Sequence, residues 1–173
     1  MPKLTADINH KLLRQAEIEL SRRSLFEFCR TLSPDYYTDN RPHLKTLCDT
    51  LQAFYERRLK KSRSKYYTKL IIEMPPQHGK SRTLTNFCAW VLGKNQQERI
   101  ITGSYNDDLA QDFSRYTRDI IQGESNSGEI VYSDIFPAVK IKYGDASYRQ
   151  WSLAGQFFNY KGTGVGGSIT GKG

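Results

Sequence analysis

The chain has little cysteine, no long apolar run and fewer acidic than basic residues. Its three cysteines form no Cys-x-x-Cys pair, and no His-x-x-x-His pair is present, so neither a disulfide framework nor a zinc site is predicted. No apolar segment approaches the length that spans a bilayer, and no signal-peptide core follows the N-terminus. We therefore expect a protein of a reducing compartment, the cytoplasm, with no membrane partner.

The excess of positive charge is unevenly distributed. The net charge is +8, and residues 1–70 hold 15 Lys and Arg against 8 Asp and Glu. The densest basic run lies between residues 57 and 65, and Arg57, Arg58, Lys60 and Lys61 are its candidate DNA-binding residues. Such a run attracts a polyanion without reading its sequence. It is equally typical of a solvated helix end, and both interpretations remain open.

The N-terminal part of the sequence predicts helices. Apolar residues recur at helical spacing in residues 8–20, and residues 25–29 suggest a second, short helix. Pro42 is typical of a helix start, and the apolar spacing after it continues to Leu59. With 38% hydrophobic and 12% aromatic residues, the chain is expected to fold. We predict a helical region over residues 1–68.

Residues 69–173 predict alternating strands and helices. Strands are expected at Lys69–Glu73 and Arg99–Gly103. Helices are expected at 80–93, ended by Gly93, and from Asn106 as N-cap to Gln122. This order predicts an α/β fold with a parallel sheet flanked by helices. Weaker strand patterns follow at Val139–Lys142, Tyr148–Leu153 and Gln156–Tyr160.

The segment Met74–Ser81 carries the strongest functional signal. It reads Met-Pro-Pro-Gln-His-Gly-Lys-Ser, between an apolar run and a predicted helix. This layout is typical of a phosphate-binding P-loop, although Met74 stands where the first glycine is expected. Together with the predicted parallel sheet, it indicates the fold of a P-loop NTPase core. In such a loop Lys80 reaches the outer phosphates of ATP and the Ser81 hydroxyl binds Mg²⁺. The alternative is an ordinary strand-to-helix turn.

Several further segments, in the same order and at similar spacing, resemble the ATPase domain of the terminase large subunit of tailed bacteriophages, a DNA-packaging motor. The resemblance covers roughly residues 40–173, and the Pro-Pro-x-His-Gly-Lys-Ser form is its most specific part. The segments that carry it are Arg41-Pro42-His43-Leu44, Ile71–Ser81, Thr102-Gly103-Ser104-Tyr105-Asn106, Leu109-Ala110, Arg115 and Arg118, Ile135-Phe136-Pro137, and Gly164–Gly171.

The resemblance implies a set of cofactors, partners and site residues. ATP and Mg²⁺ are the implied cofactors, held by Pro76, Gln77, His78, Gly79, Lys80, Ser81 and Arg82. Lys80 and Arg149 are the implied catalytic residues, with Arg115 and Arg118 as further candidates for an arginine finger. Double-stranded DNA is the implied substrate. The portal protein and the small terminase subunit are the partners of the full-length protein, in the host bacterial cytoplasm, and homo-oligomerisation stays open.

Two features depart from the family pattern. Gln77 stands where many relatives carry Arg, so this position offers a hydrogen-bond donor but no charge. The acidic pair that holds Mg²⁺ in the family comes after the Thr-Gly loop, and this sequence ends at Gly173, before it. Asp134 is expected at the surface or in a turn and is not assigned that role. We therefore expect a terminase fragment that binds nucleotide and hydrolyses it slowly.

Two other classes of protein remain as alternatives. One is a small-molecule P-loop kinase, which usually carries its loop near the N-terminus, whereas 73 residues precede Met74 here. The other is a nucleic-acid-binding fragment without ATPase activity, which uses the basic run alone. Phosphate transfer to a metabolite favours the first, and DNA binding without nucleotide binding favours the second.

Overall fold

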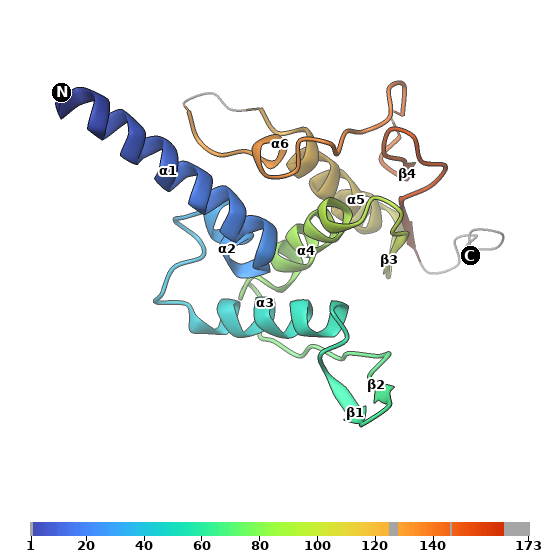
Figure 1. The fold of residues 1–173 in the computed structure, drawn as a ribbon. Helices are drawn as coiled ribbons and strands as arrows, with labels where there is room; N and C mark the ends of the chain where they lie inside the picture. The colour runs from blue at the N-terminus through green and yellow to red at the C-terminus, as the bar shows by residue number, and fades with distance from the viewer. Residues whose placement is uncertain (1, 125–127, 146, 165–173) are drawn as a thin grey trace. The chain divides into compact units, whose positions relative to one another are not determined.

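The computed structural model describes residues 2–124, 128–145 and 147–164 of a mixed α/β chain (Figure 1). The chain forms two compact units, residues 1–87 and 88–173. Helix α4, Lys80–Lys94, begins in the first unit and ends in the second. The boundary between residues 68 and 69 that the sequence suggests stays a prediction.

Three helices form most of the first unit. They are α1, Pro2–Arg23, α2, Leu25–Leu32, and α3, Pro42–Tyr55. Ser24 separates α1 from α2, and its hydroxyl accepts a hydrogen bond from Glu27 N as the N-cap of α2. Pro42 occupies the first turn of α3, where its missing N–H costs no helical hydrogen bond. These elements confirm the helices predicted in this part of the sequence.

The core of the first unit lies between α2 and α3. Leu25, Phe28 and Cys29 of α2 and Leu44 and Cys48 of α3 are fully buried. Gln52 joins the elements by polar contacts, because its amide oxygen accepts from Leu25 N at 2.9 Å and its amide nitrogen donates to Arg23 O at 2.7 Å. Gln52 of α3 therefore holds the junction between α1 and α2 by two hydrogen bonds.

Helix α3 ends at Tyr55, four residues before the predicted end. Arg57 has φ 54°, in the left-handed region, and its N–H and that of Arg58 close the helix on Phe54 O and Ala53 O. The chain then forms an antiparallel hairpin of β1, Lys60–Ser62, and β2, Lys65–Tyr66. The basic run therefore lies mostly on a hairpin, and its assignment to a helix end is wrong.

Residues 69–73, predicted as the first strand of the sheet, have no regular secondary structure. The apolar run is short, and Ile71 is 85% exposed. Pro75 and Pro76 follow closely and lack the N–H groups that a strand donates. The described three-stranded sheet does not include this segment. The predicted strand is therefore wrong, and an irregular segment precedes the predicted P-loop.

The second unit contains a three-stranded mixed sheet. Its strands are β3, Ile100–Ser104, β4, Gln150–Trp151, and β5, Tyr160–Gly164, in the order β3-β5-β4. The outer strand β3 pairs with β5 in parallel, from Ile100 opposite Tyr160 to Ser104 opposite Gly164. Strand β4 pairs with β5 in the antiparallel sense. Within the described residues, the parallel arrangement that the sequence predicts is thus limited to the pair β3 and β5.

Helix α5, Asp107–Gln122, packs on this sheet. Its N-cap is Asn106, whose side-chain oxygen accepts from Leu109 N at 2.8 Å, as predicted. The close approach of α5 to β5 requires a glycine at position 162, because a Cβ on Gly162 would clash with Ala110 O of α5. Trp151 of β4 also packs against this helix. Its ring stacks on Tyr160 of β5 at 5.0 Å between ring centroids, and its indole N–H donates to Ser114 Oγ of α5 at 3.0 Å.

The remaining predictions in the second unit are partly wrong. Gly93 does not end α4; it lies inside the helix, where a Cβ would clash with the Phe136 ring. Residues 139–142 contribute only a single bridge, from Ile141 to Leu153. The predicted strand at 148–153 is reduced to β4, and that at 156–160 begins only at Tyr160.

Asp134 lies in the short helix α6, Tyr132–Ile135. Its carboxylate accepts from Val131 N at 3.0 Å, at the start of the helix. Asp134 therefore lies in the first turn of a short helix, whereas the sequence predicts a surface or turn position.

Candidate functional site

The segment Gln77–Ser81 forms a tight turn into the long helix α4. Gln77 has φ 62° and Gly79 has φ 85°, so two left-handed residues flank His78. Gly79 O accepts the helical hydrogen bond of Thr83 N at 2.9 Å, and Lys80 is the first helical residue. The first N–H groups of a helix have no helical acceptor and carry partial positive charge. The turn therefore leads into a helix start whose first N–H groups have no helical acceptor, as at any helix N-terminus.

Gly79 is packed so closely that no side chain fits at its position. A Cβ there would lie 2.7 Å from Tyr36 Oη and 2.8 Å from Leu44 Cδ2. Leu44 is fully buried in α3, and Tyr36 belongs to the segment between α2 and α3. The helical region thus sets the position of the loop backbone, a role of Tyr36 that the sequence analysis missed.

Tyr36 also contacts two arginines. The guanidinium carbon of Arg82 lies 4.3 Å from the ring centroid of Tyr36, and that of Arg41 lies 4.5 Å from it. Arg82 donates to Ser33 Oγ at 3.0 Å, and Arg41 donates to Tyr36 O at 3.3 Å. The structure therefore places Arg82, predicted to bind cofactor, on Tyr36 and Ser33. It also brings a second cation, Arg41, to the ring that packs against Gly79.

His78 makes a local contact that shapes the loop. Its Nδ1 lies 2.8 Å from Pro76 O, a separation at which an Nδ1–H group donates to the carbonyl. The His78 ring is also 5.7 Å from the His43 ring, between ring centroids. Both contacts fit a structural role for His78 rather than direct contact with phosphate.

The first turns of α4 are anchored through Tyr37. The Tyr37 hydroxyl lies 3.1 Å from Thr83 Oγ1 and accepts from Asn86 Nδ2 at 3.0 Å. All three residues are buried, and burial is the largest cause of the raised pKa of the Tyr37 hydroxyl. This network holds α4, and with it the residues at its start, against the segment that follows α2.

Lys80 and Ser81 occupy positions that a nucleotide can reach. Lys80 is half-buried, and Ser81 is exposed, as are Pro76 and Gln77. Within the described part of the chain the Ser81 hydroxyl makes no hydrogen bond, although the Ser81 carbonyl accepts from Thr85 Oγ1. A lysine, a hydroxyl and a cradle closed to any Cβ fit the phosphates of a nucleotide and one ligand position of Mg²⁺.

Arg149 belongs to the second unit, at the carboxyl ends of β3 and β5. It donates to Asp107 Oδ2 at 3.0 Å, and Asp107 Oδ1 accepts from Gly164 N at 2.6 Å. Tyr105, in the adjacent turn, is 77% exposed. Asp107 thus joins Arg149 to the end of β5, and the role of Arg149 in catalysis stays a prediction.

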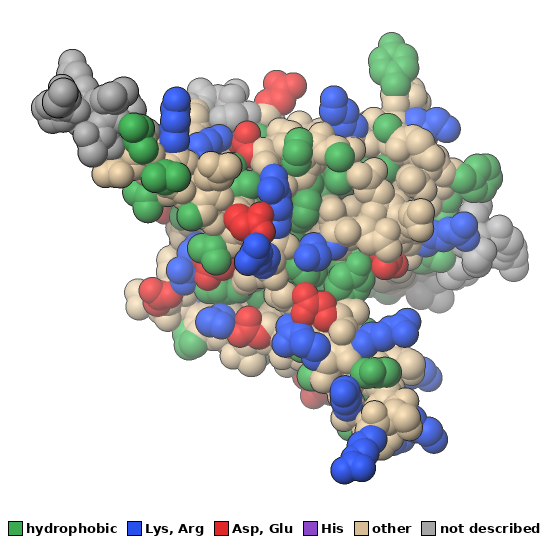
Figure 2. Space-filling view, viewed as in Figure 1, with side chains coloured by type: hydrophobic (Ala, Val, Ile, Leu, Met, Phe, Trp, Pro, Cys, Tyr) green, Lys and Arg blue, Asp and Glu red, His purple; other side chains and the backbone are tan. Residues whose placement is uncertain are grey.

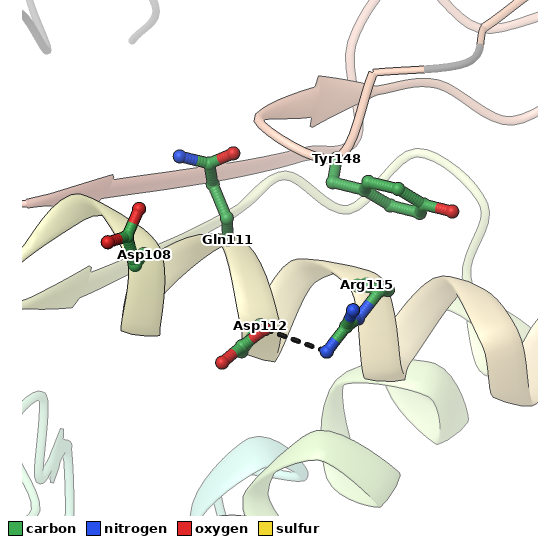
Figure 3. A pocket seen from close by; sticks show the side chains of 5 residues that line it. All are labelled: Asp108, Gln111, Asp112, Arg115 and Tyr148. Atoms are coloured by element: carbon green, nitrogen blue, oxygen red, sulfur yellow. Dashed lines mark hydrogen bonds and ion pairs between the residues drawn. The ribbon is translucent and has the colours of Figure 1, made fainter.

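Arg115 and Arg118 line one face of α5 in the second unit. Arg115 pairs with Asp112 at 2.8 Å, and Arg118 donates to Gln122 at 2.9 Å. An open pocket of about 160 Å³ lies on this face. Figure 3 shows its lining side chains, which come from α5 and from the segment before β4. It is polar and smaller than a typical ligand pocket. Its lining residues are Asp108, Gln111, Asp112, Arg115 and Tyr148.

The predicted DNA-binding residues are all exposed. Arg57 and Arg58 follow the end of α3, and Lys60 and Lys61 lie in β1. Beyond Gly164, the glycine-rich segment that contributes to the terminase resemblance lies outside the described residues.

No helix in the described ranges is long and apolar enough to cross a membrane. The sequence matches no protein-family model, and comparisons with curated proteins and with solved structures likewise give no match.

Proposed function

We propose that this chain is the ATP-binding part of a viral DNA-packaging motor of the terminase large-subunit type, which couples ATP hydrolysis to DNA translocation in the full-length protein. The observation that carries the proposal is the turn Gln77–Ser81. It combines left-handed residues, a glycine with no room for a side chain, and Lys and Ser at the start of a long helix. The order of the sequence motifs supplies the terminase assignment.

The proposal gives each residue of the loop a role. The Lys80 ammonium binds the outer phosphates, and the backbone N–H groups of Gly79 to Ser81 bind the remaining phosphate oxygens. The Ser81 hydroxyl is a ligand of Mg²⁺, which neutralises phosphate charge when bound. Pro76 and His78 shape the turn. Gln77, exposed and neutral, offers its amide as a donor in place of the arginine of many relatives.

The helical region has a supporting role in this proposal. Tyr36 limits the position of Gly79, and Tyr37 anchors α4. Arg41 and Arg82 add positive charge beside the turn, which favours an anionic ligand even without direct contact. Double-stranded DNA, the portal protein and the small terminase subunit are the proposed partners of the full-length protein.

A titration with a fluorescent ATP analogue tests this proposal. Lys80→Ala removes a charge-assisted contact worth about 1.5–3 kcal/mol, so the Kd is expected to rise by about tenfold or more. Ser81→Ala is expected to weaken the Mg²⁺-dependent part of the affinity. Lys94→Ala is the matched control, because Lys94 is the exposed last residue of the same helix. Equal affinities of the wild type and Lys80→Ala would contradict the assignment.

A nucleic-acid-binding protein without nucleotide binding is the second candidate. The exposed basic hairpin favours it, because that surface needs no nucleotide to attract a polyanion. DNA binding in the absence of any detectable nucleotide binding would select this candidate over the motor.

A further inference from the structure

The hairpin of β1 and β2 contributes no side chain to a core. Every residue of both strands is exposed. Its backbone is held by the pairing of Lys60 with Tyr66 and Ser62 with Lys65, and by the Tyr67 N–H, which donates to Leu59 O at 3.2 Å. An isolated two-stranded hairpin is only marginally stable in water. Burial of apolar surface therefore does not account for this element.

What the hairpin carries is positive charge. Residues 57–69, here called the basic hairpin, hold seven Lys and Arg and no Asp or Glu. Among the described residues only Arg58 of these cations forms an ion pair, with Glu56 at 2.7 Å. Figure 2 shows the Lys and Arg side chains gathered over β1 and β2. Like charges at this density repel one another, and a bound polyanion relieves the repulsion.

We propose that the basic hairpin binds the phosphate backbone of duplex DNA without reading its sequence. Cations that neutralise phosphates release condensed counterions, and this release drives binding. A two-stranded β-ribbon also has dimensions that the major groove of a duplex admits. This surface is distinct from the loop Gln77–Ser81, and the proposal does not require nucleotide binding.

The surroundings of Tyr66 favour a duplex over a single strand. Proteins that hold single strands offer aromatic rings on which bases stack. Here the Lys60 ammonium lies 5.9 Å from the centroid of the Tyr66 ring, so a cation already occupies that face. The hairpin therefore presents charge along two paired strands, with a cation on the Tyr66 ring and with Tyr67 as a second, exposed ring.

The test measures binding to a fluorescein-labelled duplex by fluorescence anisotropy over a series of salt concentrations. The duplex has about 30 base pairs, which is well beyond the site of one hairpin. Two variants, each with four exposed lysines changed to glutamine, have the same net charge. The hairpin variant changes Lys60, Lys61, Lys65 and Lys69. The control variant changes Lys11, Lys45, Lys140 and Lys142. Circular dichroism verifies that both variants fold.

The hairpin variant is expected to lose affinity by about tenfold or more at moderate salt. Its log–log salt slope should fall in magnitude by up to about 3.6, which is 0.9 for each of four phosphate contacts. The control variant should change by less than about threefold in the same assay, since its lysines are dispersed and long-range charge is screened. Equal losses in the two variants would show an effect of net charge alone and would overturn the proposal.

Two further arms separate the other ligands of a basic surface. Tenfold tighter binding of a single strand than of the duplex would overturn the duplex assignment. Hairpin-dependent binding to phosphatidylserine vesicles, at a salt concentration where the duplex does not bind, would assign the hairpin to a membrane surface instead. A titration of each variant with MgATP keeps the proposals apart. If the chain binds MgATP and the hairpin variant binds DNA as well as the wild type does, this inference alone is contradicted. If the chain does not bind MgATP and DNA binding depends on the hairpin, the proposed function alone is contradicted.

Discussion

Substitution of Gly79 by alanine tests whether the helical region sets the position of the loop. The backbone term comes from φ 85°, a left-handed conformation that costs an L-residue about 1–2 kcal/mol. The steric term comes from a Cβ placed 2.7 Å from Tyr36 Oη and 2.8 Å from Leu44 Cδ2. Overpacking of this kind costs about 1–3 kcal/mol. Gly79→Ala is therefore expected to destabilise the chain by about 2–5 kcal/mol.

Gly155 provides a matched control for the backbone term. Its φ is 79°, and a Cβ at this position would meet no atom within 4 Å. Gly155→Ala should therefore cost only the backbone term, about 1–2 kcal/mol. Adding Tyr36→Phe to Gly79→Ala removes the oxygen nearest to the new methyl group and should recover about 1 kcal/mol of the steric term.

Urea unfolding followed by circular dichroism measures these differences, with the m-value compared among variants to check that the unfolding transition is unchanged. The MgATP affinity is measured on the same samples and should fall only in Gly79→Ala, because the displaced loop carries Lys80. A cost of Gly79→Ala no greater than that of Gly155→Ala would refute the close packing of the loop on Tyr36 and Leu44.

Three further predictions concern the surrounding structure. Tyr37→Phe removes the hydroxyl that bonds α4, and the free energy of unfolding in urea should fall by about 1–3 kcal/mol; an unchanged midpoint would contradict the anchoring role. Asn106→Ala removes the N-cap of α5 and should cost about 0.5–2 kcal/mol, whereas Asn106→Ser should recover most of the loss. Burial raises the pKa of the Cys29 thiol, so Ellman's reagent should react with Cys29 only after unfolding. Because the unfolded thiol ionises near pH 8.5 and the folded one does not, the free energy of unfolding should fall as the pH rises above about 8.5. Rapid labelling of Cys29 in the native chain would contradict its burial.

The helices were predictable because their signals are local. The apolar spacing after Pro42 and the Asn106 cap act within a few residues, and both give the element that the structure shows. The same spacing failed at the end of α3, because Leu59 continues the apolar pattern although Arg57 already adopts a left-handed conformation. The helix propensities of the individual residues give little information about where such a helix ends.

The strands were less predictable, because a strand depends on its neighbours as well as on its own residues. Residues 69–73 read as a strand and are irregular. The short strands β1 and β2, rich in Lys and Ser, carry no apolar alternation and are nevertheless paired. β5 begins where the predicted strand 156–160 ends, because its position is set by pairing with β3 and by the contact of Gly162 with α5.

The motif identified the loop residues of the candidate site but not what surrounds them. Gly79, Lys80 and Ser81 follow directly from the P-loop pattern. Tyr36 and Arg41 lie about forty residues earlier in the sequence. Tyr36 packs against Gly79 by a tertiary contact, and Arg41 lies over the Tyr36 ring. The only available signal was Arg41-Pro42 in the family resemblance, which carries no information about the ring that Arg41 covers.

Amide chemical shifts of the isotope-labelled chain during titration with MgADP test the central claim most directly. If Gln77–Ser81 holds the phosphates, the amides of Gly79, Lys80 and Ser81 should show the largest shifts, because their N–H groups bind phosphate oxygens. The same titration of Lys80→Ala should require at least about tenfold more nucleotide for equal shifts. Unchanged amides at Gly79–Ser81 at saturating nucleotide, or the largest shifts at another site, would contradict the account.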